Sequence, residues 1–407
     1  MRYVWQNTNW TEFSWESDAL IQPLGRARLR QGRLLSKVNA LGLKFSKEAR
    51  VEILIEEAVK TAAIEGQALH RDSVRSSVAR RLGLPTAGLP AAERVVDGLV
   101  DVLLDATANY SEPLSPERLM GWQAALFPTG YSGLRKIRTG QWRGPELMQV
   151  VSGSVGKEKV HFEAPPSDRV DMEIRDFIQW WTKGSKNIEG LLRAAIVHFR
   201  FVTIHPFEDG NGRIARALTD MALAQDENLP SRFYSLSIRI MAERDGYYRV
   251  LEQCQKGDGN ITDWLVWFLE CFERALEHSE TLISNVLAKA RFWRQHGQTI
   301  LNKRQQKVIN RLLDAGPGGF KGGLTTRKYV GMVKVSRATA YREISDLVAK
   351  QIFRQNPGRG RSVSYDILWA DIAHRTFPEG FWDLVLTGKK SKEGREEVLE
   401  IETVLKK

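Results

Sequence analysis

Hydrophobic positions recur every three or four residues along most of the chain, which is the spacing of one face of an α-helix. An aromatic-rich start (Tyr3 to Trp15) and an amphipathic stretch (Leu20 to Leu35) come first. The pattern then predicts helices over residues 46–70, 74–82, 91–108, 116–126, 170–183, 191–204, 213–224, 235–255 and 262–286. Segment 191–204 is apolar nearly all round, which indicates a helix at the centre of a bundle. We therefore expect a mainly α protein.

Two regions depart from this pattern. Residues 149–156 and 159–162 are short β-prone runs separated by Gly-rich turn material, which predicts a hairpin. Near the C-terminus, residues 305–315, 324–330 and 336–350 resemble three short helices, and two strands at 353–355 and 363–367 enclose a basic turn. Helices followed by a hairpin are typical of a winged helix-turn-helix. A charged tail, 371–407, follows a domain expected over 300–370.

Composition limits the function classes without choosing one. The chain is 42% hydrophobic and 27% charged, the balance of a globular protein, and its net charge of +11 favours a polyanionic partner such as a nucleotide or nucleic acid. Cys254 and Cys271 lack metal-binding spacing, and we interpret them as buried residues in a reducing compartment. No signal peptide opens the chain and no apolar run approaches ~18 residues, so we expect a cytoplasmic protein without membrane contact.

The loop between the helices predicted at 191–204 and 213–224 concentrates chemistry. Its tripeptide Gly210-Asn211-Gly212 can turn backbone N–H groups toward an anion at the start of the next helix. Arg213 and Arg216 lie one helical turn apart, so both can reach the same polyanion. Asp209 is a carboxylate of the kind that holds Mg²⁺ beside phosphates, and His205, before the rigid Pro206, is a candidate base. Together these residues indicate nucleotidyl or phosphoryl transfer.

The run His-Pro-Phe-Glu-Asp-Gly-Asn-Gly-Arg-Ile-Ala-Arg resembles the Fic family signature HPFxDGNGRxxR at every fixed position. The resemblance implies an all-α Fic bundle with a small β-hairpin flap, here over residues 111–290. It implies transfer of AMP from ATP, with Mg²⁺, to a Ser, Thr or Tyr hydroxyl of a protein. His205 would be the base, Asp209 the Mg²⁺ ligand and Gly210-Asn211-Gly212 the anion hole. Arg213 and Arg216 would hold the phosphates that leave as pyrophosphate. Relatives that transfer UMP or phosphate usually carry altered loops.

The resemblance extends to the surroundings of the loop. Val150, Val151, Ser152 and Gly153 fit the flap, whose edge would bind the target segment by strand addition. Tyr247-Tyr248 and Gln255 fit the adenine side, although core aromatics explain the tyrosines equally well. We interpret His161 and His198 as structural.

Residues Thr61-Ala-Ala-Ile-Glu65-Gly66 match the family's inhibitory motif, [S/T]xxxE[G/N]. Thr61 and Glu65 are four residues apart, on one face of the predicted helix 46–70, within an N-terminal region expected over 1–110. If that helix docks against the loop, Glu65 would pair bidentately with Arg216 and take the place of the γ-phosphate. ATP would still bind, with its α-phosphate misaligned. In some relatives the same Glu helps to remove AMP. The alternative is a solvated Glu on an amphipathic helix.

The C-terminal module suggests a second partner. Ser336, Arg337, Thr339 and Arg342 would open a recognition helix for DNA, with Arg359 and Arg361 in the wing. The alternative is a protein-interaction or homodimerisation module. A second function class follows, a DNA-binding regulator whose Fic domain only senses nucleotide. The intact His205 favours the enzyme, because a sensor needs no base there.

Overall fold

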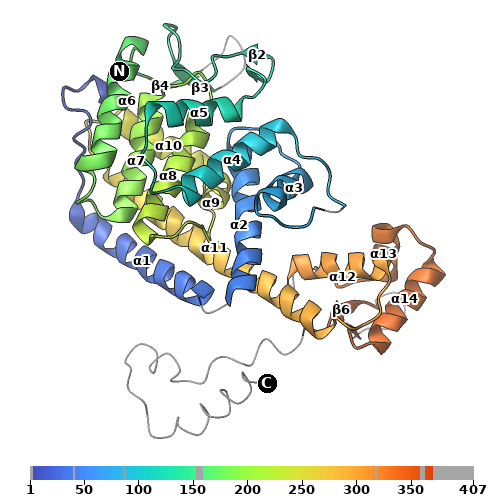
Figure 1. Cartoon of the computed structure of the whole chain (residues 1–407). Helices are drawn as coiled ribbons and strands as arrows, with labels where there is room; N and C mark the ends of the chain where they lie inside the picture. Colours follow the sequence, from blue (N-terminus) through green and yellow to red (C-terminus); the bar gives the residue numbers. More distant parts are fainter. Residues whose placement is uncertain are drawn as a thin grey trace, which may run out of the picture. The chain divides into compact units, whose positions relative to one another are not determined.

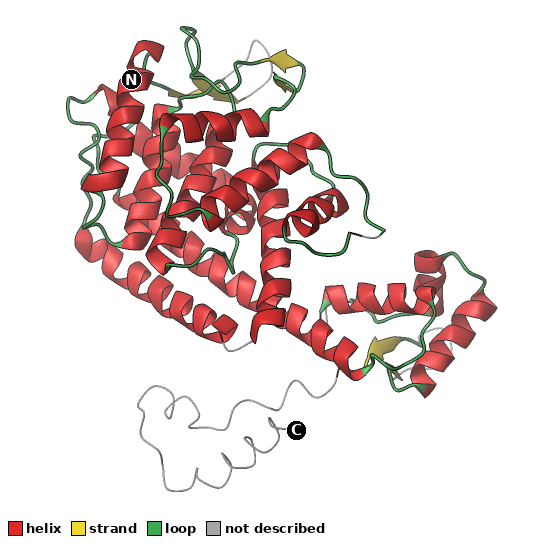
Figure 2. Ribbon diagram, in the orientation of Figure 1, coloured by secondary structure: helices red, strands yellow, loops and turns green. Residues whose placement is uncertain are grey.

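The computed structural model describes residues 3–39, 42–86, 88–152, 159–316, 320–357 and 363–369 of the 407-residue chain. The chain divides into two compact units, Met1–Ser284 and Asn285–Lys407. The described residues are mainly helical, with three pairs of short antiparallel strands (Figures 1 and 2). The mainly α fold class expected from the hydrophobic pattern is confirmed.

The first unit is a helical bundle that carries two small hairpins on one side. Its helices are α1 (Ser17–Asn39), α2 (Gly42–Ile64), α3 (Arg71–Arg81), α4 (Arg94–Ala108), α5 (Pro116–Leu126), α6 (Val170–Gln179), α7 (Gly190–Ile204), α8 (Asn211–Glu227), α9 (Leu236–Ala242), α10 (Arg244–Gln255) and α11 (Thr262–Gln295). Helix α11 continues past the boundary between the units. Short helical turns lie at η1 (Val4–Gln6), η2 (Ser167–Arg169) and η3 (Trp180–Gly184).

Helices α7 and α8 form the centre of this bundle. Nearly every side chain of α7 is buried, as its all-round apolar sequence predicts. Helix α8 packs against α7 and also contacts α2, α4 and α5 (Figure 1). The His205–Arg216 loop joins these two central helices, so its ends are held by helices whose residues are mostly buried.

Helix α2 differs from the helix predicted over 46–70, because it begins at Gly42 and ends at Ile64. Gly66 terminates it with a left-handed backbone (φ +79°). The N–H of Gly66 donates to the carbonyl of Ala63 and that of Gln67 to the carbonyl of Ala62, the two bonds of a Schellman motif. Glu65 is therefore the residue at the C-cap of α2.

The predicted hairpin is confirmed. Strands β3 (Gln149–Ser152) and β4 (Lys159–Glu163) pair antiparallel from Gln149 opposite Glu163, with an irregularity between Val150 and Val151. Gly153 lies outside the described residues. A second pair, β1 (Tyr131–Ser132) with β2 (Arg135–Lys136), was not predicted, because two-residue strands leave no alternation to detect.

The second unit has its own hydrophobic core. Its elements are α12 (Lys303–Ala315), α13 (Thr326–Val333), α14 (Arg337–Ala349), β5 (Phe353–Gln355) and β6 (Tyr365–Ile367). Ile309, Leu313, Ile344 and Phe353 are buried in that core. Three helices and a hairpin thus lie where the sequence predicts them. Arg359, Arg361 and the tail 371–407 fall outside the described residues.

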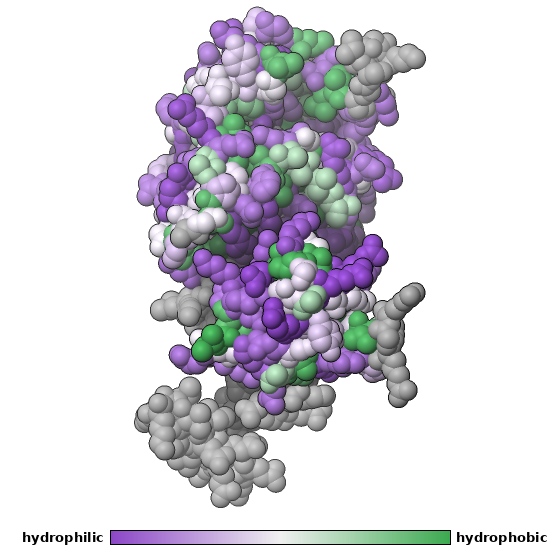
Figure 3. All heavy atoms as spheres, turned by 90° about the vertical axis from the view of Figure 1, so that its right-hand side faces the viewer, coloured by the Kyte–Doolittle hydropathy of each residue, from purple (hydrophilic) through white to green (hydrophobic). Residues whose placement is uncertain are grey.

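Figure 3 shows one face of the molecule, mostly hydrophilic with small, separate hydrophobic patches. Among the described residues, no helix has both the length and the apolar character needed to cross a membrane.

Candidate active site

The loop after α7 holds His205 in a fixed, uncommon backbone conformation. His205 has φ 51° and ψ 57°, and its N–H still donates to the carbonyl of Phe201 (3.0 Å). Arg143 holds the segment from outside: its Nε donates to the carbonyl of His205 (2.9 Å), and its backbone N–H donates to that of Pro206 (2.9 Å). The base predicted from sequence is therefore positioned by a buried arginine that the sequence did not single out.

The imidazole of His205 is oriented as a base. Its Nδ1 lies 3.1 Å from the carbonyl oxygen of Val202. A carbonyl can only accept, so Nδ1 carries the hydrogen and Nε2 keeps its lone pair in the neutral ring. Burial lowers the pKa of His205, and its hydrogen bond to Val202 offsets this only in part. The neutral, proton-accepting form is therefore favoured.

The glycines of the loop admit a close approach to the start of α8. Gly210, at the N-cap, has φ +93°, and a Cβ there would lie 3.0 Å from the Phe127 ring. Asn211 fixes the turn, because its side chain accepts from the N–H of Phe207 (3.0 Å) and donates to its carbonyl (2.8 Å). The first N–H groups of α8 thus form a rigid, positively polarised end, which suits a phosphate.

Asp209 is the single carboxylate of this loop that faces the start of α8. It accepts hydrogen bonds from the Ser132 hydroxyl and from the N–H of Gly210 (2.5 Å), and it lies 3.6 Å from Arg213 Nη2. No group of three or more His, Cys, Asp or Glu able to hold a metal occurs among the described residues. One carboxylate beside a phosphate-shaped cradle fits Mg²⁺, which takes few protein ligands and completes its shell with phosphate and water oxygens.

Both signature arginines are buried with donors to spare. Arg213 lies over the Phe127 ring (4.7 Å to the centroid), and its Nη1 donates to Gln67 (3.3 Å). Arg213 Nε and Arg216 Nη1 are buried without a hydrogen-bond partner in the described part of the chain. Buried guanidinium groups with unused donors are costly unless a ligand satisfies them. A polyphosphate would supply those acceptors.

Helix α2 brings Thr61 and Glu65 onto Arg216. Arg216 Nε donates to Thr61 Oγ1 (2.7 Å), and its Nη2 donates to the Thr61 carbonyl (3.0 Å) and to Glu65 Oε1 (2.7 Å). The pairing of Glu65 is thus through one guanidinium nitrogen, which corrects the bidentate pair expected from sequence. The second position of the fork is taken by Thr61. Burial lowers the pKa of Arg216, but the Glu65 carboxylate together with the nearby Tyr247 and Tyr248 outweighs this, and the net shift is upward.

The Glu65 carboxylate fills the anion cradle itself. A Cβ added to Gly212 would overlap with Glu65 Oε1 and approach Arg216 Nη1 to 3.2 Å. The carboxylate therefore lies over the first turn of α8, between the glycine and the guanidinium. An anion is favourable at the N-terminus of α8 and unfavourable at the C-terminus of α2, where Glu65 also sits. Arg244 relieves the second effect, since its Nε donates to the Ile64 carbonyl (2.8 Å).

The other residues predicted around the loop divide into buried and exposed positions. Tyr247 (2% exposed) bonds His198 Nε2 through its hydroxyl (2.8 Å), and the buried Gln255 donates to Thr203 Oγ1 (3.2 Å). Both lie in the core under α7. Tyr248 is half-buried beside Arg244. In the flap, Val151 is 48% exposed and Val150 half-buried.

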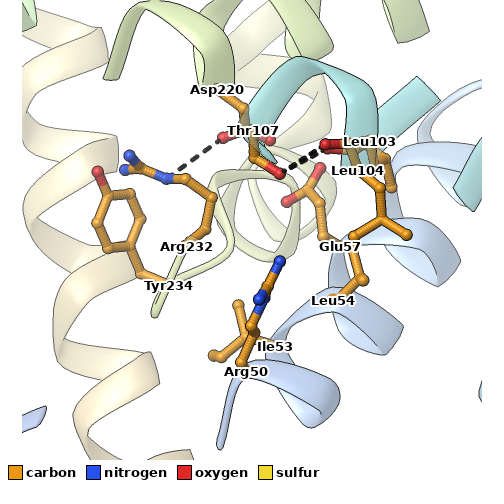
Figure 4. Close-up of a pocket in the computed structure, with 10 residues that line it drawn as sticks. All are labelled: Arg50, Ile53, Leu54, Glu57, Leu103, Leu104, Thr107, Asp220, Arg232 and Tyr234. Carbon is orange, nitrogen blue, oxygen red and sulfur yellow. Dashed lines mark hydrogen bonds and ion pairs between the residues drawn. The ribbon is translucent and has the colours of Figure 1, made fainter. Parts of the chain in front are cut away.

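A small cavity is lined by residues of α2, α4 and α8 and by Arg232 and Tyr234 (Figure 4). Asp220, one turn beyond Arg216, faces it with Glu57 of α2 and Arg232. Glu57 accepts from the hydroxyls of Ser235 and Ser237, whereas burial raises the pKa of Asp220 well above its ordinary value. This cavity belongs to the packing of α2 on α8 and lies apart from the His205 loop.

Three residues near the loop were missed from sequence: Arg143, Ser132 and Gln67. Each contacts the loop from a segment far away in the chain. The only sequence signal for Arg143 is a lone arginine in a Gly- and Trp-rich stretch, Gly140-Gln-Trp-Arg-Gly144, between two predicted elements.

Two family models match parts of this chain, and one of the matched parts contains the site. The model of the Fic/DOC family matches residues 113–223, and that of a domain of unknown function (DUF4172) matches residues 3–84. The residues matched by the Fic/DOC model include the flap, the loop and most of α8.

Curated relatives are named protein adenylyltransferases. The protein adenylyltransferase Fic of Nematostella vectensis is 23% identical over 234 residues, 57% of this chain and 50% of that protein. A probable protein adenylyltransferase of Aquifex aeolicus is 30% identical over 138 residues, 31% of this chain and 43% of that protein. The chain therefore spans about half the length of these relatives. Among solved structures, a Fic family protein from Desulfovibrio desulfuricans G20 is similar at 20% identity and a TM-score of 0.48, covering 86% of this chain and 95% of that one.

Proposed function

We propose that this protein transfers AMP from ATP to a Ser, Thr or Tyr hydroxyl of a target protein, and that Glu65 restrains the reaction. One observation carries the proposal. A histidine whose ring is fixed by a hydrogen bond, His205, lies in the same loop as a helix start that carries two buried arginines with unused donors. The Fic/DOC domain and the names of the relatives support the choice of reaction.

In the proposed reaction the target hydroxyl oxygen attacks the α-phosphorus of ATP. His205 Nε2 takes the hydroxyl proton as the new P–O bond forms. The bond from the α-phosphorus to the bridging oxygen breaks, and pyrophosphate leaves with that electron pair. Arg213, Arg216 and the N–H groups at the start of α8 hold the leaving phosphates through charge-assisted hydrogen bonds. Mg²⁺, held by Asp209, would neutralise phosphate charge when bound.

The proposed restraint follows because Glu65 and the triphosphate of ATP would occupy the same position. Glu65 and a terminal phosphate of ATP would compete for Arg216 and for the cradle over Gly212. While Glu65 stays docked, the triphosphate has to shift, and its α-phosphorus is no longer in line with the incoming hydroxyl. Release of Glu65 would free Arg216 Nη2 for phosphate without moving the base. The flap, with Val151 exposed, would present the target segment.

The test is AMP incorporation from labelled ATP into native lysate proteins, followed by mass spectrometry. We expect Glu65→Gly to raise incorporation by roughly one to two orders of magnitude, within the usual range of a coupling free energy, and His205→Ala to abolish it. The matched control is Glu56→Gly, on the same helix, because the Glu56 carboxylate pairs with Arg71 instead of α8. That control should stay close to the unmodified protein.

The outcomes separate the two parts of the proposal. Equal activation by Glu56→Gly would mean that loosening α2 matters and the Glu65 carboxylate does not. No activation by Glu65→Gly, with loss in His205→Ala, would remove the restraint and keep the transfer. Adducts with the mass of phosphate or UMP would overturn the reaction class.

A further inference from the structure

The positive charge of the protein is concentrated in one segment. Residues 285–369 contain 17 Lys and Arg against four Asp and Glu, a net charge of +13. The remaining 43 Lys and Arg are slightly outnumbered by 45 Asp and Glu, so the rest of the chain is close to neutral. The excess that gives the whole chain +11 therefore lies in the second unit. A field of this size attracts a polyanion.

Three of the four acidic residues of this segment are already paired with cations that lie outside the exposed face of α14. Asp314 pairs with Lys289 (2.6 Å), Asp346 with Lys350 (2.6 Å), and Glu343 with Arg304. By contrast, Arg337 and Arg342 are exposed and have no ion pair with any described residue. The unpaired cations are thus left on the surface, including the face of α14.

Helix α14 has one face buried in the core of the second unit and the opposite face exposed to solvent. Ala340, Ile344 and Leu347 anchor it in the core of the second unit. The opposite face is exposed and runs through Arg337, Ala338, Tyr341, Arg342 and Ser345. These positions are one to four residues apart and form a continuous stripe along the helix. Ser336 caps the helix by accepting from the N–H of Thr339 (3.1 Å).

We propose that the exposed stripe of α14 (orange-red in Figure 1) binds duplex DNA in the major groove. A single helix fits that groove, and arginines are the side chains that most often contact guanine edges and phosphates there. Ala338 and Ser345 are small and let the helix approach the bases closely. The first-turn N–H groups of α14 supply a further phosphate contact. The inference does not depend on AMP transfer.

A protein partner fits this surface less well. Among the described residues of the second unit, only Ile300 and Tyr341 are large, exposed hydrophobic side chains, and they lie on different elements. Protein-binding faces usually carry a contiguous apolar patch. Charge complementarity therefore favours DNA.

The experiment measures fluorescence polarisation of a 30-base-pair labelled duplex titrated with the full-length protein across a NaCl series. We expect binding that weakens with salt. The double variant Arg337→Ala/Arg342→Ala should weaken DNA binding at least about tenfold. It should also reduce the slope of log K against log[NaCl] by about two, one for each removed cation that contacts a phosphate. The matched control is Lys307→Ala/Arg311→Ala, which removes from α12 of the same unit two exposed cations that have no ion pair within the described part of the chain.

Three results would overturn the proposal. Equal losses in both double variants would mean diffuse attraction without a role for α14. Tighter binding of RNA than of duplex DNA would assign the surface to another nucleic acid. Loss of a dimer in the α14 variant by light scattering, with DNA binding unchanged, would assign it to a second copy of the chain. Unchanged circular dichroism excludes misfolding, since both pairs are exposed.

Discussion

His205 combines an uncommon backbone conformation with a well-defined ring. A non-glycine residue at φ 51° costs about 1–3 kcal/mol, which the surroundings must offset. Arg143 holds the His205 carbonyl, and the double hydrogen bond between Asn211 and Phe207 closes the loop on the other side. These contacts fix the backbone at the end of α7, and the hydrogen bond from Nδ1 to the Val202 carbonyl fixes the ring.

The ring of His205 should titrate below its ordinary value. Burial lowers its pKa, so the neutral base persists to a pH below 6.5 in the free protein. The Glu65 carboxylate acts in the opposite direction, so Glu65→Gly should lower the midpoint further. The measurement is an NMR titration of the histidine ring signals, with His205→Ala to assign the peak. A midpoint at or above 6.5 in the unmodified protein would contradict the environment described for this ring.

The sequence alone identified the site residues that lie close together along the chain. His205, Asp209, Arg213 and Arg216 lie within twelve positions, and their order alone indicates phosphate chemistry. Arg143 could not be found this way, because its role is to reach the His205 carbonyl from 62 positions earlier. The single-nitrogen pairing of Arg216 with Glu65 also depends on the position of Thr61 after folding.

At the scale of elements, the end of α2 determines where the proposed restraint, Glu65, lies. The sequence pattern predicts a helix to residue 70, because the spacing of hydrophobic residues marks no sharp end. In the structure α2 ends at Ile64, because Gly66 takes a left-handed backbone conformation. The Schellman motif places Glu65 at the last turn, where its side chain reaches across to α8. In the same way, the predicted helix 235–255 is two helices, α9 and α10, because the chain leaves helical geometry at Glu243. Such boundaries depend on single residues and are poorly visible in a periodic pattern.

Gly66→Ala should loosen the end of α2. Its φ of +79° costs a residue with a Cβ about 1–2 kcal/mol, although the space around it is empty. We expect a lower Tm and a partial gain in AMP incorporation, smaller than that of Glu65→Gly.

Gly83→Ala is the matched control for that prediction. Gly83 ends α3 with φ +64°, also in empty space, so its replacement should lower stability by a similar amount. It should leave AMP incorporation unchanged. Equal gains in activity from both variants would show that the end of α2 has no special role.

For the whole molecule, the two units differ in charge and in core. The first unit is nearly neutral and centred on α7 and α8, while the second has its own core and carries the positive excess. The sequence predicted the elements of the second unit well, because its short helices have clear caps at Asn302, Thr325 and Ser336. It did not show that the predicted regions 1–110 and 111–290 fold into one compact unit, since that depends on contacts between α2, α4 and α8.

Separate cores predict separate thermal transitions. Ile344→Ala removes a fully buried side chain of the second unit and should cost about 2–5 kcal/mol there. Calorimetry should show one transition moving down while the other stays, and AMP incorporation by the Glu65→Gly protein should persist at temperatures between them. Leu218→Ala, in the buried part of α8, should lower the other transition and reduce AMP incorporation. A single transition that both variants lower equally would mean that the two cores unfold cooperatively, and the division of the chain would then have no thermodynamic meaning.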